Sequence, residues 1–334
     1  MGLWLAVSLA LAFALTNGFH DAANAIATLV ATRGARPGPA IALSSVFNLL
    51  GALLVGTAVA ETIAGIVTVP VAQAVAVIGS GAFAATLWNL LTWWRGLPSS
   101  SAHALVGGLV GAALTAGGLD AVQWGGLDGW RPVGVFGVLF ALAVSPFLGL
   151  GAAFSTVRLV RWFLRRATQR VQGPIRAAQW GMSAALSFSH GANDAQKAMG
   201  VIGALLVADG RLDTFGVPLW AMLACGVALT LGTAMGGWRI VRTLGRRIFR
   251  VSSIDAFASQ ASSAAVILGS SYAGAPVSTT QVVASSVVGV GGGRRRWGHV
   301  RWAVVRSMVF AWLLTLPAAA VFGAVTFVAW NAIL

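Results

Sequence analysis

The sequence contains very little charge. Only 9% of its 334 residues are Asp, Glu, Lys or Arg, while 57% are hydrophobic and the mean hydropathy is +0.83. Soluble domains carry about 25% charged residues, so this composition argues against a soluble fold. A transmembrane helix needs about 20 apolar residues, and the chain offers about ten such segments. Backbone groups in lipid must be paired internally, so these segments are predicted to be helices.

Residues that carry covalent or enzymatic chemistry are also scarce. The single cysteine, Cys225, excludes an internal disulfide. The four histidines are scattered, and no metal-ligand cluster or nucleophile–base–acid set is recognisable. An enzyme therefore ranks behind transport, and no cofactor is predicted. No Gly-x-x-x-x-Gly-Lys-Ser/Thr loop occurs, so a primary pump would need another subunit. The first apolar segment lacks a basic leader, so we expect it to remain in the mature protein.

The charges that are present are mostly arginines in short loops. The net charge is +14, but a nucleic-acid reader gathers basic residues on one soluble face, so no nucleic-acid binding is predicted. If segment 157–176 is cytoplasmic, 19 of the 22 basic residues fall on that side: Arg33, Arg36, Arg95, six from Arg158 to Arg176, five from Arg239 to Arg250 and five from Arg294 to Arg306. This positive-inside pattern predicts a multi-pass cell-membrane protein with both termini extracytoplasmic.

The apolar segments form two sets of five. The first set is 2–31, 39–60, 72–94, 98–118 and 132–156; the second is 177–208, 218–238, 253–272, 276–292 and 302–331. Because five is odd, the second copy is upside down, as in the inverted repeats of many secondary transporters. We predict an all-α polytopic membrane protein with repeat 1 at 1–156, an Arg-rich cytoplasmic connector at 157–176 and inverted repeat 2 at 177–334. Segments 72–118 and 253–292 are predicted to be re-entrant hairpins, since their turns carry hydroxyl clusters.

Two acidic motifs interrupt the first segment of each set. Gly18-Phe-His-Asp-Ala-Ala-Asn-Ala-Ile26 contains Asp21, and Gly191-Ala-Asn-Asp-Ala-Gln-Lys-Ala-Met199 contains Asp194, 173 residues later. An acid within a membrane costs roughly 2.5–3.5 kcal/mol on insertion scales and is a functional candidate by default. We expect both segments to be bent or broken helices at these motifs.

A second duplicated motif follows a proline. Pro98-Ser-Ser-Ser-Ala-His103 and Pro276-Val-Ser-Thr-Thr-Gln281 are 178 residues apart, and two motifs in the same order at nearly the same offset indicate a duplication. Proline suits the first turn of a helix, where backbone N–H groups lack partners and the dipole is positive. Two such helix starts meeting at the midplane would bind a polyatomic anion. The alternative is ordinary capping by Ser and Thr.

The acidic motifs suit a cation. Asp21 and Asn24 lie at i and i+3 on one helix face and offer oxygens to a hard ion. Asn193 and Asp194 are adjacent and converge only if the helix is distorted. A multivalent anion needs compensating charge in lipid, so we expect Asp21 and Asp194 to hold co-transported cations or accept protons. A structural polar network is the alternative. Lys197 is interpreted as a counter-ion of Asp194.

Other polar residues are secondary candidates. His20 and His190 flank the acidic motifs and titrate near neutral pH, although packing explains them equally well. His103 is a candidate for substrate contact, and its equivalent Gln281 gives no support to a paired-histidine proton relay. Asp255 fits either the site or the start of a helix.

With these residues identified, the sequence resembles the inorganic phosphate transporter (PiT) family, and within it the bacterial low-affinity phosphate permeases. The matching stretches run from Asn17 to Ala27, Pro98 to His103, Ser189 to Gly200 and Gly274 to Thr280. They occur in both halves, so the resemblance covers essentially the whole chain.

The resemblance implies import of inorganic phosphate coupled to H⁺ or Na⁺, with a neutral metal–phosphate complex as substrate in some bacterial members. It implies that the cation, Na⁺ in a sodium-coupled protein, contacts Asp21, Asn24, Asn193 and Asp194. The implied phosphate site is lined by Ser100, Ser101, Ser278, Thr279 and Thr280, to which the motifs themselves add Ser99, His103 and Gln281. Whether the protein forms a homo-oligomer is left open.

Some residues depart from the family pattern. His20 and Lys197 replace asparagines of the general motif, Ala102 replaces a threonine, and Gln281 stands where histidine is usual. Some relatives of the family carry sulfate, so sulfate import on the same scaffold is the nearest alternative. A passive anion channel is the rival from another functional class.

Overall fold

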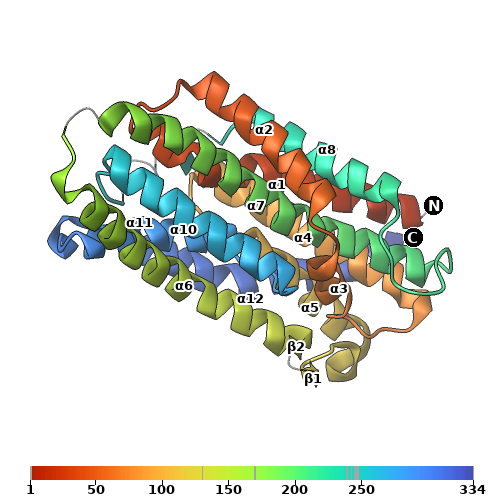
Figure 1. Ribbon diagram of the computed structural model, residues 1–334. Coiled ribbons are helices and arrows are strands. Elements are labelled where there is room, and N and C mark those ends of the chain that lie inside the picture. Colours follow the sequence, from red (N-terminus) through yellow and green to blue (C-terminus); the bar gives the residue numbers. More distant parts are fainter. Residues whose placement is uncertain are drawn as a thin grey trace.

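Long helices run side by side along one axis in the computed structural model, which describes residues 2–129, 131–168, 171–237, 240–241, 243 and 248–333 (Figure 1). Both chain ends lie at one end of this bundle, which we call the terminal end. The 3₁₀ segment Leu164–Arg166 lies at the opposite end, which we call the arginine-rich end. Five arginines of the predicted inside set lie outside the described residues: Arg170, Arg239, Arg242, Arg246 and Arg247.

Among its described residues, the first half has six α-helices and a small β-hairpin. In chain order these elements are α1 (Gly2–Ala31), α2 (Pro37–Leu54), α3 (Ala58–Ala64), α4 (Val71–Arg95), α5 (Ser101–Gly117), β1 (Gly126–Asp128), β2 (Arg131–Val133) and α6 (Gly134–Phe163). The two strands pair antiparallel with Gly126 opposite Val133. A 3₁₀ segment, Gly118–Ala121, follows α5.

The second half follows after the 3₁₀ segment Leu164–Arg166. Its described helices are α7 (Gln172–Ala208), α8 (Leu219–Met235), α10 (Ser253–Tyr272), α11 (Thr279–Gly293) and α12 (Trp302–Ile333). Between α11 and α12 lies the 3₁₀ segment Trp297–His299. Helices α6 and α7 extend into the predicted connector 157–176, so that residues 164–171 separate them.

The two halves repeat the same packing with exchanged partners. Helix α1 packs on α8 of the other half and α7 packs on α2; likewise α5 packs on α12 and α11 on α6. Glycines of the acidic motifs permit the first two contacts. A Cβ atom at Gly18 would lie 2.2 Å from the carbonyl oxygen of Leu229, and one at Gly191 would lie 2.0 Å from that of Asn48. Small residues let membrane helices approach this closely. The predicted inverted repeat is confirmed.

Helix pairs α4–α5 and α10–α11 form the two re-entrant hairpins. The first turn lies inside the bundle, where the indole of Trp312, within α12, donates a 3.0 Å hydrogen bond to the carbonyl oxygen of Pro98. At the second turn, the Thr62 hydroxyl donates a 2.7 Å hydrogen bond to the carbonyl oxygen of Gly274. Figure 1 shows α4 starting near the terminal end, whereas α10 starts near Arg161 at the arginine-rich end. The hairpins therefore enter from opposite sides.

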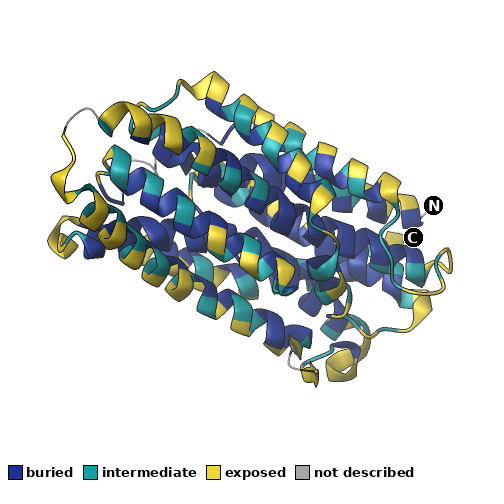
Figure 2. Cartoon of the chain, in the orientation of Figure 1, coloured by how far each residue is buried: buried dark blue, intermediate teal, exposed yellow. Residues whose placement is uncertain are grey.

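The outer surface of the bundle is apolar over much of its length. Large hydrophobic side chains are exposed on it, including Phe140 (63%), Phe147 (74%) and Leu313 (72%). Figure 2 shows the exposed residues along the outward faces of the helices, around a buried interior. Among the described residues, six helices are long and apolar enough to cross a membrane. Because exposing so much apolar surface to water is unfavourable, this is the fold of a membrane protein.

Two predictions about individual segments are wrong, namely a break in the first helix of each half and a single span at 39–60. Helices α1 and α7 are continuous over 30 and 37 residues and are not broken at their acidic motifs. The motif side chains find partners on neighbouring elements, so the backbone hydrogen bonds of each helix persist. Segment 39–60 is not one span, because α2 ends at Leu54 and α3 begins at Ala58. Between them, Gly56 has a φ of +90°, a conformation that glycine adopts at little cost.

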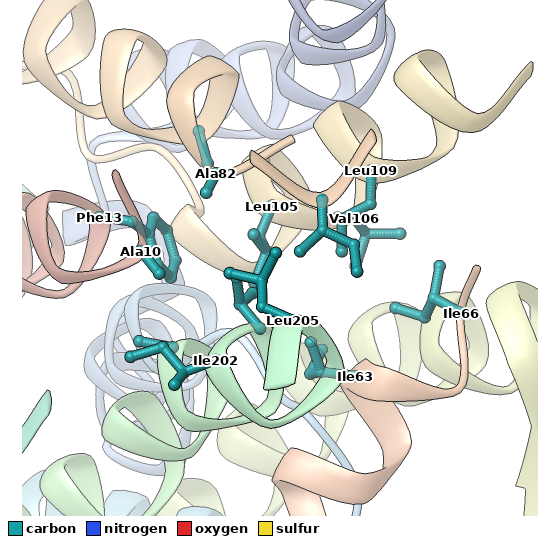
Figure 3. Close-up of a cluster of buried hydrophobic side chains, with 14 of the residues drawn as sticks. Ala10, Phe13, Ile63, Ile66, Ala82, Leu105, Val106, Leu109, Ile202 and Leu205 are labelled. Carbon is teal, nitrogen blue, oxygen red and sulfur yellow. The ribbon is translucent and has the colours of Figure 1, made fainter. Parts of the chain in front are cut away.

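An apolar layer separates the acidic motifs from the terminal end. Figure 3 shows Phe13 of α1, Ile63 of α3, Leu105 of α5 and Leu205 of α7 within one group of side chains, and all four are buried. A second apolar cluster, which includes Ile26 of α1, lies toward the arginine-rich end. The acidic motifs therefore lie between two apolar layers.

Candidate functional site

Both acidic motifs meet the start of the second hairpin's return helix. Thr279 is the first residue of α11, and its hydroxyl lies 3.3 Å from Asp21 Oδ2 and 3.0 Å from Asp194 Oδ2. A single hydroxyl hydrogen is thus within reach of carboxylates from two different halves. The Thr280 hydroxyl donates to Asp21 Oδ1 at 3.0 Å. We call the following residues the central cluster: Asp21, Asn24, Asp194, Lys197, Thr279 and Thr280.

Water has little access to these groups. Among the residues predicted for the site, His103 is partly exposed, and each of the others is at most 5% exposed. The amide nitrogen of Asn24 donates to Thr279 at 3.3 Å and to Thr280 at 3.0 Å. Its amide oxygen has no hydrogen-bond partner within the described part of the chain. Buried polar atoms are normally paired, so this oxygen is available to a ligand.

Lys197 and His190 surround the carboxylate of Asp194. The Lys197 ammonium donates to Asp194 Oδ1 and, at 2.9 Å, to the carbonyl oxygen of Val277. Lys197 is thus the counter-ion that the sequence predicted. His190 Nε2 lies 2.8 Å from Asp194 Oδ2, and His190 Nδ1 lies 3.0 Å from the amide oxygen of Asn48. Asp194 therefore has a basic group beside each of its oxygens.

A hydrogen-bonded chain links the first hairpin to the central cluster. His20 Nδ1 lies 2.6 Å from Asp21 Oδ1, and His20 Nε2 lies 3.2 Å from the hydroxyls of both Ser99 and Thr92. Ser99 in turn donates to Thr92 at 2.9 Å. Since Thr280 also donates to Asp21, the chain extends from the start of α5 to the start of α11. The two hydroxyl motifs thus approach one another through α1.

The serines at both helix starts also act as caps. The Ser100 hydroxyl accepts from the backbone N–H of His103 at 3.3 Å and lies 2.7 Å from His103 Nδ1. At the equivalent position, the Ser278 hydroxyl accepts from the backbone N–H of Gln281 at 3.3 Å. The motifs start helices as expected, and capping occupies one hydroxyl of each. Within the described residues, the buried Ser101 hydroxyl and the Gln281 amide oxygen have no partner.

Two candidates lie apart from the central cluster. Asn193 donates to the Ser271 hydroxyl at 3.0 Å and to the carbonyl oxygen of Ala275 at 3.3 Å, at the turn of the second hairpin. The expected convergence of Asn193 with Asp194 is wrong, because α7 is regular and successive side chains point about 100° apart. Asp255 forms a capping box with Ser252 at the start of α10 and pairs with Arg294 and Arg161.

The sequence reasoning missed the partners of the motif residues. Thr92 and Ser271 contact His20 and Asn193 respectively, each at the end of the first helix of its hairpin. They are 179 residues apart, close to the offset of the proline motifs, so the repeat itself could have identified them. Asn17, four residues before Asp21 on the same helix face, was also missed. It is fully buried, and its amide atoms lack partners within the described residues.

The site can hold a cation. In the described part of the chain, ligand atoms of Asp21, His190 and Asp194 all lie within 4.8 Å of one another. The oxygens of Asn24 and Thr279 are close by, and carboxylate, amide and hydroxyl oxygens are ligands of hard cations. The same helix start carries unpaired backbone N–H groups and a positive dipole, which favour an anion. The arrangement suits an anion and a cation bound side by side.

Known proteins match this chain along its whole length. The model of the phosphate transporter family matches residues 17–173 and 164–323. A probable low-affinity inorganic phosphate transporter of Rhizobium meliloti is 39% identical over 97% of this chain and 95% of its own. Proteins of the same description are 43% identical in Mycobacterium tuberculosis H37Rv, over 97% of this chain and 76% of the relative, and 38% identical in Bacillus subtilis, over 98% and 97%.

A solved structure agrees. It is described as the sodium-dependent phosphate transporter, shares 26% of its sequence with this chain and superposes with a TM-score of 0.87 over 100% of both chains. The superposition therefore covers both halves of this chain. The chain belongs to the phosphate transporter family.

Proposed function

We propose that this protein imports inorganic phosphate across the cell membrane by secondary active transport, coupled to H⁺ or Na⁺. The observation that carries the proposal is the bridge at Thr279, where one helix start reaches buried carboxylates of both halves. A site built from both inverted halves is what alternating access requires, because motion of one half against the other opens it to one side at a time.

Phosphate binds at the two helix starts in this proposal. Its oxygens accept hydrogen bonds from free backbone N–H groups and from the hydroxyls around them. One buried donor that lacks a partner within the described residues supports this role, the Ser101 hydroxyl. The phosphate-contacting set is Ser99, Ser100, Ser101, His103, Ser278, Thr279, Thr280 and Gln281.

The driving cation binds beside the phosphate. Asp21 and the unpaired amide oxygen of Asn24 supply its ligands, with Asp194 on the other half, whereas Asn193 lies at the turn of the second hairpin. Carboxylates buried in a membrane are costly without a compensating charge, and a bound cation or proton provides it. The solved structure that this chain resembles is described as sodium-dependent, which makes Na⁺ a candidate driver here. A divalent metal accompanying phosphate would enter as cargo.

Two apolar layers act as gates. The layer around Phe13 and Leu205 closes the path to the terminal end, and the cluster around Ile26 closes the path to the arginine-rich end. Enclosing uncompensated carboxylates between the two closed layers is costly, whereas a bound cation neutralises them and lets the loaded site be closed off from both sides. The arginine-rich end is cytoplasmic in this proposal, so both termini are extracytoplasmic.

The test is phosphate uptake into vesicles reconstituted with the purified protein, with Na⁺, H⁺ and divalent-metal gradients imposed one at a time. We expect accumulation above equilibrium with at least one gradient, unaffected by excess sulfate and lost in Asp21→Asn and Asp194→Asn. Asp213→Asn, an exposed acid near the terminal end, is the matched control and should retain uptake. Uptake that only equilibrates under every gradient would identify a channel, and competition by sulfate would identify a sulfate carrier.

A further inference from the structure

The two acidic motifs present chemically different faces at equivalent positions. In α1 the residues at i, i+4 and i+7 are Asn17, Asp21 and Asn24. In α7 the residues 173 positions later are His190, Asp194 and Lys197. Side chains at this spacing share one face of a helix. The duplicated acid is therefore flanked by neutral amides in the first half and by basic groups in the second.

The carboxylate of the second half already has a cation. The Lys197 ammonium is bonded to Asp194 Oδ1 and to the carbonyl oxygen of Val277, and the residue is 1% exposed. A carboxylate oxygen and a backbone carbonyl oxygen are the kinds of ligand that a hard metal cation takes. The ammonium therefore lies where a bound cation would otherwise find its oxygens.

Within the described residues, no ammonium contacts the carboxylate of the first half. Asp21 contacts His20, Thr279 and Thr280. The flanking oxygens, Asn24 Oδ1 and Asn17 Oδ1, are buried and lack hydrogen-bond partners within the described residues. An unpaired buried oxygen is costly unless a ligand satisfies it. The first half thus offers a carboxylate with unpaired amide oxygens on the same face.

We propose that Lys197 is a tethered cation, which takes in the second half the place that a mobile cation takes at Asp21 in the first. This inference rests on the proposed function. It adds that the two acids together bind one mobile coupling cation. Lys197 is the counter-ion of Asp194, which leaves the carboxylate of Asp21 for one mobile cation. The inverted repeat would then be symmetric in shape but asymmetric in coupling.

The test substitutes Lys197 by the residue at the equivalent position of the first half. Lys197→Asn restores an amide oxygen and opens a second cation site, whereas Lys197→Met removes the ammonium without adding a ligand. The probe is Na⁺ at constant pH, titrated during phosphate uptake into reconstituted vesicles. We expect the apparent affinity for Na⁺ to be about tenfold or more higher in Lys197→Asn than in Lys197→Met, because the asparagine adds one ligand oxygen. Its Hill coefficient for Na⁺ should exceed that of the parent protein.

An ordinary structural ion pair predicts a different result. If Lys197 only holds α7 in place, Lys197→Asn and Lys197→Met lose uptake alike at every Na⁺ concentration, and the inference is wrong. Should neither variant fold, Asn24→Lys supplies the reverse test, because an ammonium at the first acid should abolish the dependence of uptake on the driving cation. Asn24→Lys with the cation dependence of the parent overturns the inference. Failure of the proposed function looks different, since the parent itself would then respond to no gradient.

Discussion

Removal of the Thr279 hydroxyl should weaken phosphate binding while the fold is retained. Valine has nearly the shape of threonine, so Thr279→Val leaves the packing at the start of α11 in place. The change removes the group that lies 3.0 Å from Asp194 and 3.3 Å from Asp21. It also removes the acceptor of a 3.3 Å hydrogen bond from Asn24.

The magnitude follows from the charge of the partners. A hydrogen bond to a charged group contributes about 1.5–3 kcal/mol, and the one hydroxyl hydrogen serves one carboxylate at a time. With the driving cation bound at the carboxylates, this hydrogen is donated to phosphate instead, and at about 1.4 kcal/mol per factor of ten its loss weakens phosphate binding roughly 10- to 150-fold. Both acids keep other partners, namely His20 and Thr280 for Asp21, and Lys197 for Asp194. We therefore expect weaker binding and not unfolding.

The assay is titration calorimetry of phosphate into purified protein at a saturating concentration of the driving cation. Ser285→Ala is the matched control, since Ser285 also lies on α11 but bonds to the carbonyl oxygen of Val282 in its own helix. We expect this control to bind phosphate like the parent. Equal dissociation constants for Thr279→Val and Ser285→Ala would refute the placement of phosphate at the bridge.

Two further predictions concern the fold. Gly191→Ala should lower the free energy of unfolding in detergent by about 1–3 kcal/mol, because its Cβ would meet the backbone of Asn48 at 2.0 Å. At Gly181 in the same helix a Cβ meets nothing within 4 Å, so Gly181→Ala is the control and should be neutral or stabilising. Equal melting temperatures for the two variants would contradict the packing of α7 on α2. Asp255→Ala should lower the free energy of unfolding by about 3–5 kcal/mol, because it removes one partner of the buried ion pair with Arg294 as well as part of the cap of α10. It should leave the phosphate dissociation constant unchanged, and a weakened constant would place Asp255 in the site.

Much of the architecture could be predicted from the sequence because both motifs occur twice, in the same order and at nearly the same offset. The offset between Asp21 and Asp194 and the odd number of segments in each set require an inverted second half, and hydroxyls at Pro98 and Pro276 indicate hairpins. The break between α2 and α3 was not predicted, because the residues around Gly56 are as apolar as a span. A hydropathy profile cannot distinguish a turn at a single glycine from a continuous apolar helix.

The site was predictable by residue type but not by partner. Asp21 and Asp194 were singled out because acids are costly in lipid, and Thr279 because it follows Pro276 at a helix start; the structure brings the three together. Which atoms pair depends on the rotation of each helix about its axis. That rotation directs Asn193 toward Ser271 and Asp194 toward Thr279, although the two residues are neighbours in sequence. A distorted helix was expected because the tertiary partners of both side chains were unknown.

A disulfide between the two halves would show directly whether α1 and α11 meet at one shared transport site. Cys225→Ala provides a background without cysteine, and Asn24→Cys with Thr280→Cys replaces two side chains whose polar atoms lie 3.0 Å apart, on α1 and α11. A protease site placed between α6 and α7 separates the halves. We predict that mild oxidation keeps the cleaved fragments linked until a reductant is added. Fragments that separate after oxidation of the folded protein would contradict a shared site.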